Sequence, residues 1–340
     1  MPLPRAVNAA AHRGRQVQPA VDLRSDSSSL PSGEMLQAMA AARLGNDMYG
    51  EDPTANELEA AAARLLGKES AVLMPSGVMA NQIALSVLAG PDQPVAVGSL
   101  SHIHVFEGDL PQRRLMPLDD TDDDRFVELV WSARHTVAAV AVENTHMARE
   151  GHVMSPALLA SLAQGGVPIH LDGARLMNAA AALDVRPDEI AAHATTVMLT
   201  LSKGLGAPIG SVLAGPDDVM KRARRLRLAL GGGLAQAGVV AAAGLVALRR
   251  PLADFRSDHQ RAVRLRAAAE QRWPGSTLPR TSEATNIVMW SPPDVGSVVA
   301  RLADRGILVL AWGDTFIRAV THPGVSEQSM DRVVEEIASL

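Results

Sequence analysis

Cysteine is absent from this chain of 340 residues, and aromatic side chains make up only 3% of it. The first absence excludes disulfide bonds, thiolate nucleophiles and the commonest structural zinc sites, and it fits a reducing cytoplasm. The second means that alanine, leucine and valine must fill the interior. Tyr49 is the only tyrosine. A functional role for it competes with the commoner arrangement, a half-buried ring whose hydroxyl reaches the surface.

Long apolar runs and a large excess of one charge are also missing. No run reaches the length of a transmembrane helix, and the first twenty residues hold no continuous apolar segment like that of a secretory signal. The formal net charge is −5 and the pI is near 6.1, so no positive field would draw the chain to nucleic acid or to an anionic membrane. We therefore predict a cytoplasmic protein whose ligand is a small molecule. The basic segment 221–227 is better explained as a helical face or a contact for a ligand's phosphate than as a nucleic-acid site.

The chain does have a regular alternation of helix and strand patterns. Short apolar runs bounded by turn residues predict buried strands, and the segments between them predict helices. The predicted strands cover residues 70–74, 94–97, 137–142, 167–171 and 196–201, and the predicted helices include 80–88 and 156–163. This order is typical of an α/β fold with a doubly wound, mostly parallel sheet, which binds ligands at the carboxyl ends of its strands.

Local signals predict two helix boundaries. Thr54 and Glu57 have the spacing of a capping box, which places the start of a helix there, and Gly67 ends it. An alanine-rich helical stretch runs over residues 235–250, where Pro251 stops or kinks it.

The pattern changes after Pro251 and predicts a compact second α/β unit. Its elements are a helix at 261–272, a strand at 286–290, a helix at 295–305, strands near 307–311 and 316–320, and a final amphipathic helix at 327–340. We expect three parts in the chain: a loose N-terminal arm at 1–20, a large domain at 21–250 and a small C-terminal domain at 251–340.

A lysine in a glycine-rich loop is the first candidate for chemistry. Lys203 follows a predicted strand and precedes Gly204, Gly206 and Gly210. A solvated loop lysine is the commoner case. Here the glycines let the backbone approach a bulky group, and an amine in a partly desolvated pocket has a lowered pKa suited to imine formation. The order of the residues excludes a P-loop.

Charged residues also follow the preceding strand. Asp172 ends the strand predicted at 167–171, and Arg175 lies just beyond it. An isolated Asp-Gly-x-Arg is usually a turn with a surface ion pair. If this strand and the one before Lys203 are parallel neighbours, however, Asp172 and Lys203 leave the sheet at the same edge and can face opposite ends of one ligand.

A third element is a helix that begins near Val78, directly after Ser76 and Gly77. The unpaired N–H groups at a helix N-terminus bind phosphate without any specific side chain. On its own this signal is weak, because serine is also a common N-cap.

Eight motifs in this sequence resemble those of the low-specificity L-threonine aldolases, in the order of that family. They are DLRSD (22–26), MYGEDPT (48–54), SGVMAN (76–81), SHIHVFE (101–107), ENTH (143–146), HLDGAR (170–175), LSKGLGAPIGS (201–211) and RAVTH (318–322). The resemblance covers about residues 21–340. Each motif is modest, but eight at similar spacing are highly specific.

The resemblance implies a fold like that of aspartate aminotransferase. The large domain would hold a mostly parallel, seven-stranded sheet between helices, and the small C-terminal domain would be α/β. The implied cofactor is pyridoxal 5'-phosphate, and no metal is implied. The implied assembly is a homotetramer, a dimer of dimers with active sites at the dimer interface.

The resemblance also implies roles for residues around the cofactor. Lys203 would form the Schiff base, Asp172 would hold the protonated pyridine nitrogen, and His102 would stack on the ring. The phosphate and the rest of the cofactor would be held by a set of nearby residues: Ser76, Gly77, Val78, Arg175 and Ser202.

For the substrate, the resemblance implies that Ser25, Arg175 and Arg318 clamp the carboxylate, a duty that suits the planar fork of arginine. His146, with His102 as the alternative, would lie near the β-hydroxyl group. Tyr49 would border the cofactor site, from the same or the neighbouring subunit.

The match departs from the family mainly at the phosphate end. Val78 stands where a threonine is usual, and Leu228 and Ala235 stand where basic residues often flank the glycine-rich segment. Backbone amides and Ser202 could hold the phosphate instead, or one of three arginines could: Arg224, Arg225 or Arg227. The segment Gly108, Asp109 and Leu110 also departs from the family pattern.

The predicted reaction is the retro-aldol cleavage of L-threonine, L-allo-threonine or a related β-hydroxy-α-amino acid to glycine and an aldehyde. Two alternatives stay open. One is another reaction of the same cofactor, such as β-elimination or transaldol transfer. The other is a non-catalytic homologue with weakened cofactor binding, which rests on Val78, Leu228 and Ala235. The sequence does not give the natural substrate, the stereochemical preference at Cβ or the role of the N-terminal arm.

Overall fold

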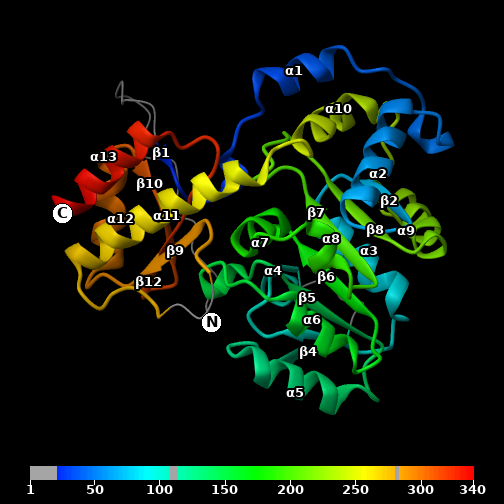
Figure 1. The fold of residues 1–340 in the computed structure, drawn as a ribbon, viewed down its shortest axis with the longest axis horizontal. Coiled ribbons are helices and arrows are strands. Elements are labelled where there is room, and N and C mark those ends of the chain that lie inside the picture. Colours follow the sequence, from blue (N-terminus) through cyan, green and yellow to red (C-terminus); the bar gives the residue numbers. More distant parts are fainter. Residues whose placement is uncertain (1–20, 108–113, 280–282) are drawn as a thin grey trace.

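The computed structural model describes residues 21–107, 114–279 and 283–340. The expected N-terminal arm at 1–20 and the divergent segment Gly108 to Leu110 lie outside these residues. Figure 1 shows two unequal lobes, with helix α11 (Leu252–Arg272) running from the larger lobe onto the smaller one.

A seven-stranded sheet lies at the centre of the larger lobe. Its strand order is β2-β8-β7-β6-β5-β3-β4, and all neighbouring pairs from β7 to β4 are parallel, whereas β8 is antiparallel to both β7 and β2. The strands are β2 (Ser70–Met74), β3 (Val95–Gly98), β4 (Leu115–Leu118), β5 (Ala139–Glu143), β6 (Ile169–Gly173), β7 (Thr196–Thr200) and β8 (Ser211–Gly215). The predicted α/β fold with a mostly parallel seven-stranded sheet is thereby confirmed.

Helices cover both faces of this sheet. They are α1 (Gly33–Ala40), α2 (Pro53–Leu65), α3 (Gly77–Leu88), α4 (His102–Glu107), α5 (Asp123–Ala133), α6 (Pro156–Ala163), α7 (Leu176–Leu183), α8 (Pro187–Ala191), α9 (Asp217–Ala229) and α10 (Gly238–Ala247), with short 3-10 helices η2 (Asp26–Ser28), η3 (Asp47–Tyr49) and η4 (Met147–Arg149). Figure 1 shows α1 lying against α10 at the edge of the lobe.

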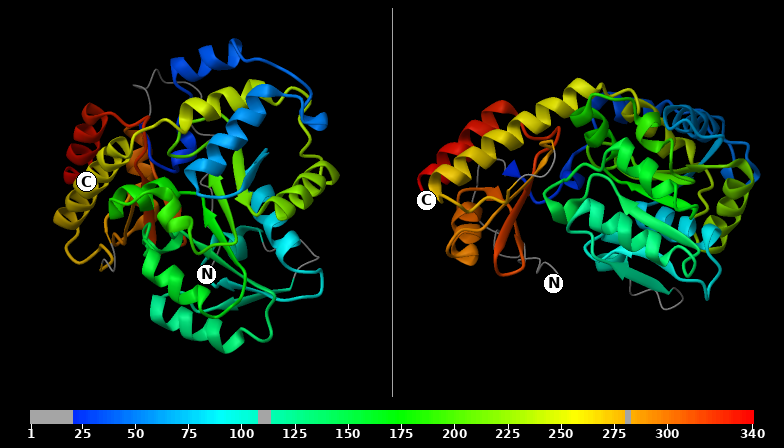
Figure 2. Two further views of the ribbon diagram at one scale, coloured as in Figure 1. Left: turned by 45° about the vertical axis from the view of Figure 1, so that its right-hand side comes forward. Right: turned by 60° about the horizontal axis from the view of Figure 1, so that its bottom comes forward.

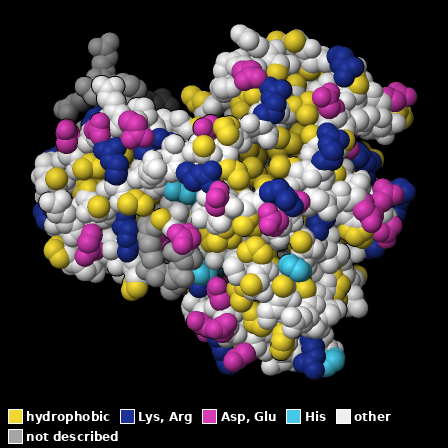
Figure 3. Space-filling model, viewed as in Figure 1, with side chains coloured by type: hydrophobic (Ala, Val, Ile, Leu, Met, Phe, Trp, Pro, Cys, Tyr) yellow, Lys and Arg dark blue, Asp and Glu magenta, His cyan; other side chains and the backbone are white. Residues whose placement is uncertain are grey.

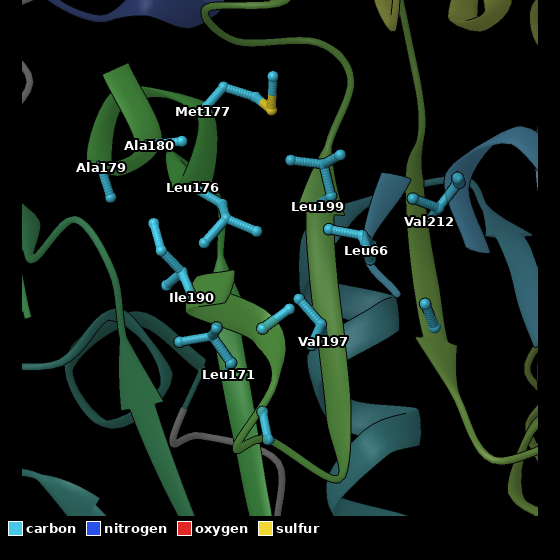
Figure 4. Packing of buried hydrophobic residues seen from close by; sticks show 14 of the residues in the cluster. Leu66, Leu171, Leu176, Met177, Ala179, Ala180, Ile190, Val197, Leu199 and Val212 are labelled. Atoms are coloured by element: carbon cyan, nitrogen blue, oxygen red, sulfur yellow. The ribbon is translucent and has the colours of Figure 1, made fainter. Parts of the chain in front are cut away.

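The core of the larger lobe is built from small aliphatic residues, as the scarcity of aromatics requires. Leu171 from β6 and Val197 and Leu199 from β7 point toward Leu176 of α7 and Ile190 of α8, and all five are buried (Figure 4). Burial of one such leucine or valine side chain contributes about 1.5 to 3 kcal/mol. This packing fixes the strand ends that carry the site.

The smaller lobe has its own sheet and core. The antiparallel order β11-β12-β9 joins β11 (Leu310–Trp312), β12 (Phe316–Val320) and β9 (Ile287–Trp290), and β1 (Val21–Asp22) pairs in parallel with β10 (Ile307–Leu308). α11 and α13 (Glu327–Ala338) lie side by side over these strands, and α12 (Val295–Asp304) completes the lobe (Figure 2). Val21 and Leu23 pack into this core. The first described residues therefore belong to the smaller lobe, together with the C-terminal part of the chain. The division at residues 250 and 251 stays a prediction.

Two of the local helix signals were read wrongly. The N-cap of α2 is Asp52, whose carboxylate accepts hydrogen bonds from the N–H groups of Thr54 and Ala55, so Thr54 lies inside the helix instead of capping it. A buried aspartate directly before Pro53 satisfies two N–H groups at once. α10 ends at Ala247, with Leu248 as its C-cap, and not at the predicted residue 250. Pro251 is the N-cap of α11, which therefore begins well before the predicted residue 261.

In the described ranges, no helix is both long enough and apolar enough to cross a lipid bilayer.

Candidate active site

A cavity of about 250 Å³ lies at the carboxyl ends of the central strands. Its walls come from the ends of β6 and β7, the loop that follows β7, and the first turns of α3 and α4. Ligands bind at this edge in open α/β sheets. Residues from four separate motifs that we expected to hold a cofactor line it together: Ser76, Gly77, Val78, His102, Asp172, Ser202 and Lys203.

Lys203 brings a buried amine to this cavity. Within residues 21–107, 114–279 and 283–340, the amine makes neither a hydrogen bond nor an ion pair. Burial lowers the pKa of Lys203, and the positive charge of Arg175 lowers it further, against the opposing effect of Asp26, Asp172 and Glu143. A lowered pKa increases the fraction of the amine that has a free lone pair, which favours its attack on carbonyl groups.

Asp172 is the last residue but one of β6 and lines the same cavity. β6 and β7 are parallel neighbours, with Asp172 paired to Met198, so Asp172 and Lys203 do leave the sheet at one edge. The Asp172 carboxylate accepts hydrogen bonds from Asn81 Nδ2 (2.9 Å) and from the N–H of Ala174 (3.0 Å). Its position is therefore fixed from both sides.

His102 is held at the first position of α4. Its backbone N–H donates to Glu143 Oε2 (2.8 Å), and its ring atom Nδ1 lies 2.8 Å from Glu107 Oε1. The imidazole ring packs at 5.1 Å from the Phe106 ring. The His102 side chain is 30% exposed and lines the cavity.

The N-terminus of α3 forms another wall of the cavity. Ser76 is the N-cap, and its hydroxyl accepts from the N–H of Met79 (3.2 Å). Gly77 fits closely here, because a Cβ at this position would lie 3.1 Å from Thr200 Oγ1 and 3.3 Å from Met198 Cε, and these side chains would have to shift. The first N–H groups of a twelve-residue helix therefore point toward the ligand space, where they favour an anion. Val78 adds only an apolar side chain, 42% exposed.

Arg175, Arg318 and Asp26 form a buried charged cluster beside the cavity. Arg175 donates from Nε and Nη2 to the two carboxylate oxygens of Asp26, both at 2.8 Å. Burial opposes ionisation of Asp26, but Arg175, followed by Lys203 and Arg318, holds the pKa of this carboxyl group well below its usual range. Burial alone would lower the pKa of Arg175, and the charge and hydrogen bonds of Asp26 outweigh it, so the net shift is upward.

Arg318 differs from Arg175 in having no acidic partner in the described residues. Its Nε is buried and makes no hydrogen bond, and its guanidinium carbon lies 5.0 Å from the centre of the Trp312 ring. Burial, together with the charge of Arg175, lowers the pKa of Arg318 to about 10. An unpaired buried guanidinium is costly unless an anion completes it, which fits a site for a carboxylate.

Ser25 and Tyr49 lie at different distances from this centre. Ser25 precedes Asp26 and caps η2, with its hydroxyl 3.4 Å from Asp26 Oδ1, so it lies at the edge of the charged cluster. Tyr49 ends η3, is 75% exposed and does not line the cavity. Within one chain, the structure does not bring Tyr49 into the site.

His146 lies outside the large cavity, in a small one of about 10 Å³ that shares Glu143 with it. His146 Nε2 is 2.8 Å from Asp120 Oδ2, and its buried Nδ1 has no hydrogen-bond partner in the described part of the chain. Burial favours the neutral form of Asp120, but the hydrogen bond and charge of His146 hold its pKa below the usual value. Because the carboxylate accepts, a neutral ring has its proton on Nε2 and its lone pair on Nδ1.

None of the three arginines considered for the phosphate lines the cavity. Arg227 is fully buried and pairs with Asp47 while donating to the Leu73 carbonyl oxygen. Arg224 pairs with Glu59, and Arg225 is exposed. Lys203 is the only cation among the cavity's described lining residues.

Four functional candidates were not assigned a role from the sequence, although each stands inside a quoted motif: Asp26, Asn81, Glu107 and Glu143. Glu143 could have been found, because it ends a buried strand as Asp172 does. In the register of the sheet it lies directly beside Asp172. Asn81 and Glu107 carry no signal of their own, since only tertiary packing brings α3 and α4 together.

Comparisons with known proteins agree with this geometry. The model of the β-eliminating lyase family matches residues 22–291. Low-specificity L-threonine aldolase 1 of Arabidopsis thaliana is 34% identical over 90% of this chain and 92% of its own length. The low specificity L-threonine aldolase of Escherichia coli K12 is 33% identical over 92% of this chain and 97% of its own. A solved threonine aldolase of Leishmania major, 20% identical, superposes with a TM-score of 0.78 over 94% of this chain and 99% of its own.

Proposed function

Because this chain belongs to the β-eliminating lyase family and to the low-specificity L-threonine aldolases, we propose that it cleaves L-threonine, L-allo-threonine or a close β-hydroxy-α-amino acid to glycine and an aldehyde. The protein is a lyase of the threonine aldolase type, and its cofactor is pyridoxal 5'-phosphate. The substrate and the roles of single residues are our proposals.

The residues of the cavity fit this cofactor. A free buried amine stands at one side of the cavity and a carboxylate at another, and an exposed helix N-terminus supplies N–H groups for an anion. In our proposal Lys203 holds the cofactor covalently, Asp172 pairs with its ring nitrogen, and His102 packs against its ring. Ser202 and the first turn of α3 would hold its phosphate.

The charged cluster would bind the substrate carboxylate. Arg318 has an unpaired Nε aimed at no protein acceptor in the described residues, whereas Arg175 already spends two donors on Asp26. We therefore assign the principal carboxylate contact to Arg318. Arg175 and Ser25 take supporting positions, and Asp26 keeps Arg175 in place.

His146 would accept the proton of the β-hydroxyl group. Its hydrogen bond to Asp120 places the ring proton on Nε2 and leaves Nδ1 as the basic atom. Because His146 lies in the neighbouring small cavity, we expect it to act through one water molecule, for which a volume of about 10 Å³ is just sufficient. Loss of this proton lets the Cα–Cβ bond break and releases the aldehyde.

The chemistry that bound pyridoxal phosphate supplies is an electron sink for the pair left on Cα. Asp172 favours this role by stabilising positive charge on the ring nitrogen, and its burial excludes water that would weaken the interaction. A proton delivered to Cα then completes glycine.

The observation that carries the proposal is the pairing of the unpartnered Lys203 amine with Asp172 across one cavity at the sheet edge. A panel of β-hydroxy amino acids with the purified holoprotein tests it, with L-alanine as a substrate lacking the hydroxyl. We expect equal amounts of glycine and aldehyde from L-threonine or L-allo-threonine and none from alanine. No glycine from any member of the panel would contradict the proposal.

The same panel separates the competing reactions. β-Elimination would release ammonia and a 2-oxo acid instead of glycine, and transaldol transfer would need an added acceptor aldehyde. A non-catalytic homologue would release nothing and would bind the cofactor weakly. Both Lys203 and Asp172 are present and line the same cavity, where a ligand can reach them. Their presence favours a catalytic protein over a non-catalytic homologue.

An apolar patch beside the cavity supports a homo-oligomer. We call Met48, Tyr49, Val78, Leu228 and Leu230 the mouth patch; each is at least 39% exposed. Two of its members, Leu228 and Met48, both lie beside Gly233. Large hydrophobic side chains also gather on the face around α1 and α10 (Figure 3).

We propose that a second copy of the chain covers the mouth patch, in a dimer that assembles further into a tetramer. This arrangement would bury Tyr49 near a cofactor site and could supply the cation that this chain lacks at the phosphate end. Light scattering of wild type and Leu228→Glu tests it: a monomeric wild type would contradict it, and dissociation of the variant would support it. The cytoplasm remains the compartment that we propose, on the cysteine-free composition.

A further inference from the structure

A buried amide on α3 contacts two of the three carboxylates among the cavity's described lining residues. Asn81 Nδ2 lies 2.9 Å from Asp172 Oδ2 and 3.0 Å from Glu107 Oε1. Asn81 is 1% exposed. The amide nitrogen has two hydrogens, so it can donate one to each carboxylate. Through Glu107, which also bonds His102 Nδ1, the amide reaches the ring beside the cavity.

His170 fixes the direction in which this amide points. Its Nε2 is 3.0 Å from Asn81 Oδ1, and its Nδ1 is 2.9 Å from Thr196 Oγ1. A reversed amide would aim its oxygen at two carboxylates, so the oxygen must face His170, and Nε2 must be the donor. Burial lowers the pKa of His170 to about 4, which keeps the ring neutral with a single N–H. The Thr196 hydroxyl then donates to Nδ1.

The amide separates two groups of like charge. One ligating atom each of His102, Glu107 and Asp172 lies within 4.8 Å of the others. These atoms could hold a cation, but they are already engaged with one another and with Asn81, so we assign no metal to them. Like charges this close repel each other, and a hydrogen-bond donor between them offsets the repulsion. Asn81 supplies that donor.

We propose that Asn81 is a positioning residue that keeps the Asp172 carboxylate aimed at the cofactor ring, and that His170 holds Asn81 in the orientation this requires. The inference rests on the proposed function, since it assumes that the cofactor occupies the cavity. Asn81 itself need not touch the reacting atoms. Its loss would weaken cofactor binding through Asp172 and alter the electronic state of the bound ring.

Two neighbouring amides allow a matched comparison. Gln82 is the next residue on α3, is also buried, and donates to Glu107 Oε2 at 2.9 Å, but it makes no contact with Asp172. Asn81→Leu and Gln82→Leu therefore remove the same kind of donor from Glu107, and only the first also removes the donor to Asp172. His170→Phe keeps a ring of similar shape and removes the N–H that orients Asn81.

Each full-length apoprotein would be titrated with pyridoxal phosphate, and the dissociation constant and visible spectrum of the bound cofactor would be recorded. We expect Asn81→Leu to raise the dissociation constant at least ten-fold and to change the visible band, and Gln82→Leu to raise it less than three-fold with an unchanged band. His170→Phe should act in the direction of Asn81→Leu. Circular dichroism of the apoproteins monitors folding, and His170→Phe carries the test if Asn81→Leu does not fold.

The outcomes separate this inference from the proposed function. Equal dissociation constants and spectra for Asn81→Leu and Gln82→Leu, with tight binding in the wild type, overturn the role of Asn81 and leave the function intact. Wild-type behaviour of His170→Phe overturns the orienting role of His170. A wild-type protein that binds no cofactor overturns both the function and the inference.

Discussion

Replacement of Asp26 by asparagine should destabilise the protein strongly, because the Arg175 guanidinium would remain buried without its counter-ion. The two side chains of this pair are 3% and 0% exposed, and both hydrogen bonds are 2.8 Å long. Removing one partner of such a buried pair costs about 3 to 5 kcal/mol. Lys203 and Arg318 add to the cost, since Asp26 also offsets their charges.

The assay is urea unfolding of the apoprotein, with Glu34→Gln as the control. Glu34 pairs with Arg249 at the surface, where both side chains are about two-thirds exposed, so the control should cost less than about 1 kcal/mol. A loss in Asp26→Asn no larger than in the control would refute the reasoning.

The contribution of Asp26 to stability should also depend on pH in the acid range. The folded-state pKa of Asp26 lies below its ordinary value of 3.8, so its contribution to stability is fully present above about pH 4 and is lost as the pH falls below it. Between about pH 4 and pH 2, wild type should lose more stability than Asp26→Asn does. Parallel losses in the two proteins would place the acid sensitivity elsewhere.

Three further substitutions test the site. Val78→Thr adds a hydroxyl at the N-terminus of α3 without changing the shape of the side chain. It should tighten cofactor binding about ten-fold, because a hydrogen bond to a charged group contributes about 1.5 kcal/mol. Titration of the apoproteins of wild type, this variant and a Val78→Ala control with pyridoxal phosphate measures the change. Arg318→Ala should raise KM for every amino-acid substrate by at least ten-fold, and an unchanged KM would remove Arg318 from the carboxylate site. Asp120→Asn should lower kcat at least ten-fold with little change in KM or in cofactor affinity. The asparagine oxygen would stay with the Leu100 N–H, so the amide NH2 would face His146 Nε2 and no longer accept its proton in a hydrogen bond. An equal fall in cofactor affinity would indicate a structural role instead.

The sequence predicted most of the central sheet because its parallel strands are buried on both faces. Residues 70–74 and 316–320 were placed as the structure has them, in β2 and β12. β8 was not predicted. Its five residues begin inside the glycine-rich lysine motif, which was interpreted as a loop. β4 was overlooked because its side chains are only half-buried at the sheet edge, and Pro117 lies inside it.

The site was harder to predict where partners come from distant segments. Asp172 and Lys203 follow consecutive strands of the chain, so topology alone placed them together. The ion pair of Arg175 with Asp26 joins residues 149 positions apart, and nothing local in the sequence indicates it. His146 illustrates the other limit. The ENTH motif gives its identity, but only the fold shows that His146 is hydrogen-bonded to Asp120 and that it lies in a separate small cavity.

The central claim, that Lys203 carries the cofactor, can be tested by reducing the holoprotein with sodium borohydride and mapping its peptides by mass spectrometry. The chain has only three lysines, which makes the assignment unambiguous. Lys68 donates to the carbonyl oxygens of Ala191 and Ala194, and Lys221 pairs with Asp217 at the surface. We predict the added mass of a phosphopyridoxyl group on Lys203 alone. An unmodified Lys203, or the same mass on Lys68 or Lys221, would contradict the account.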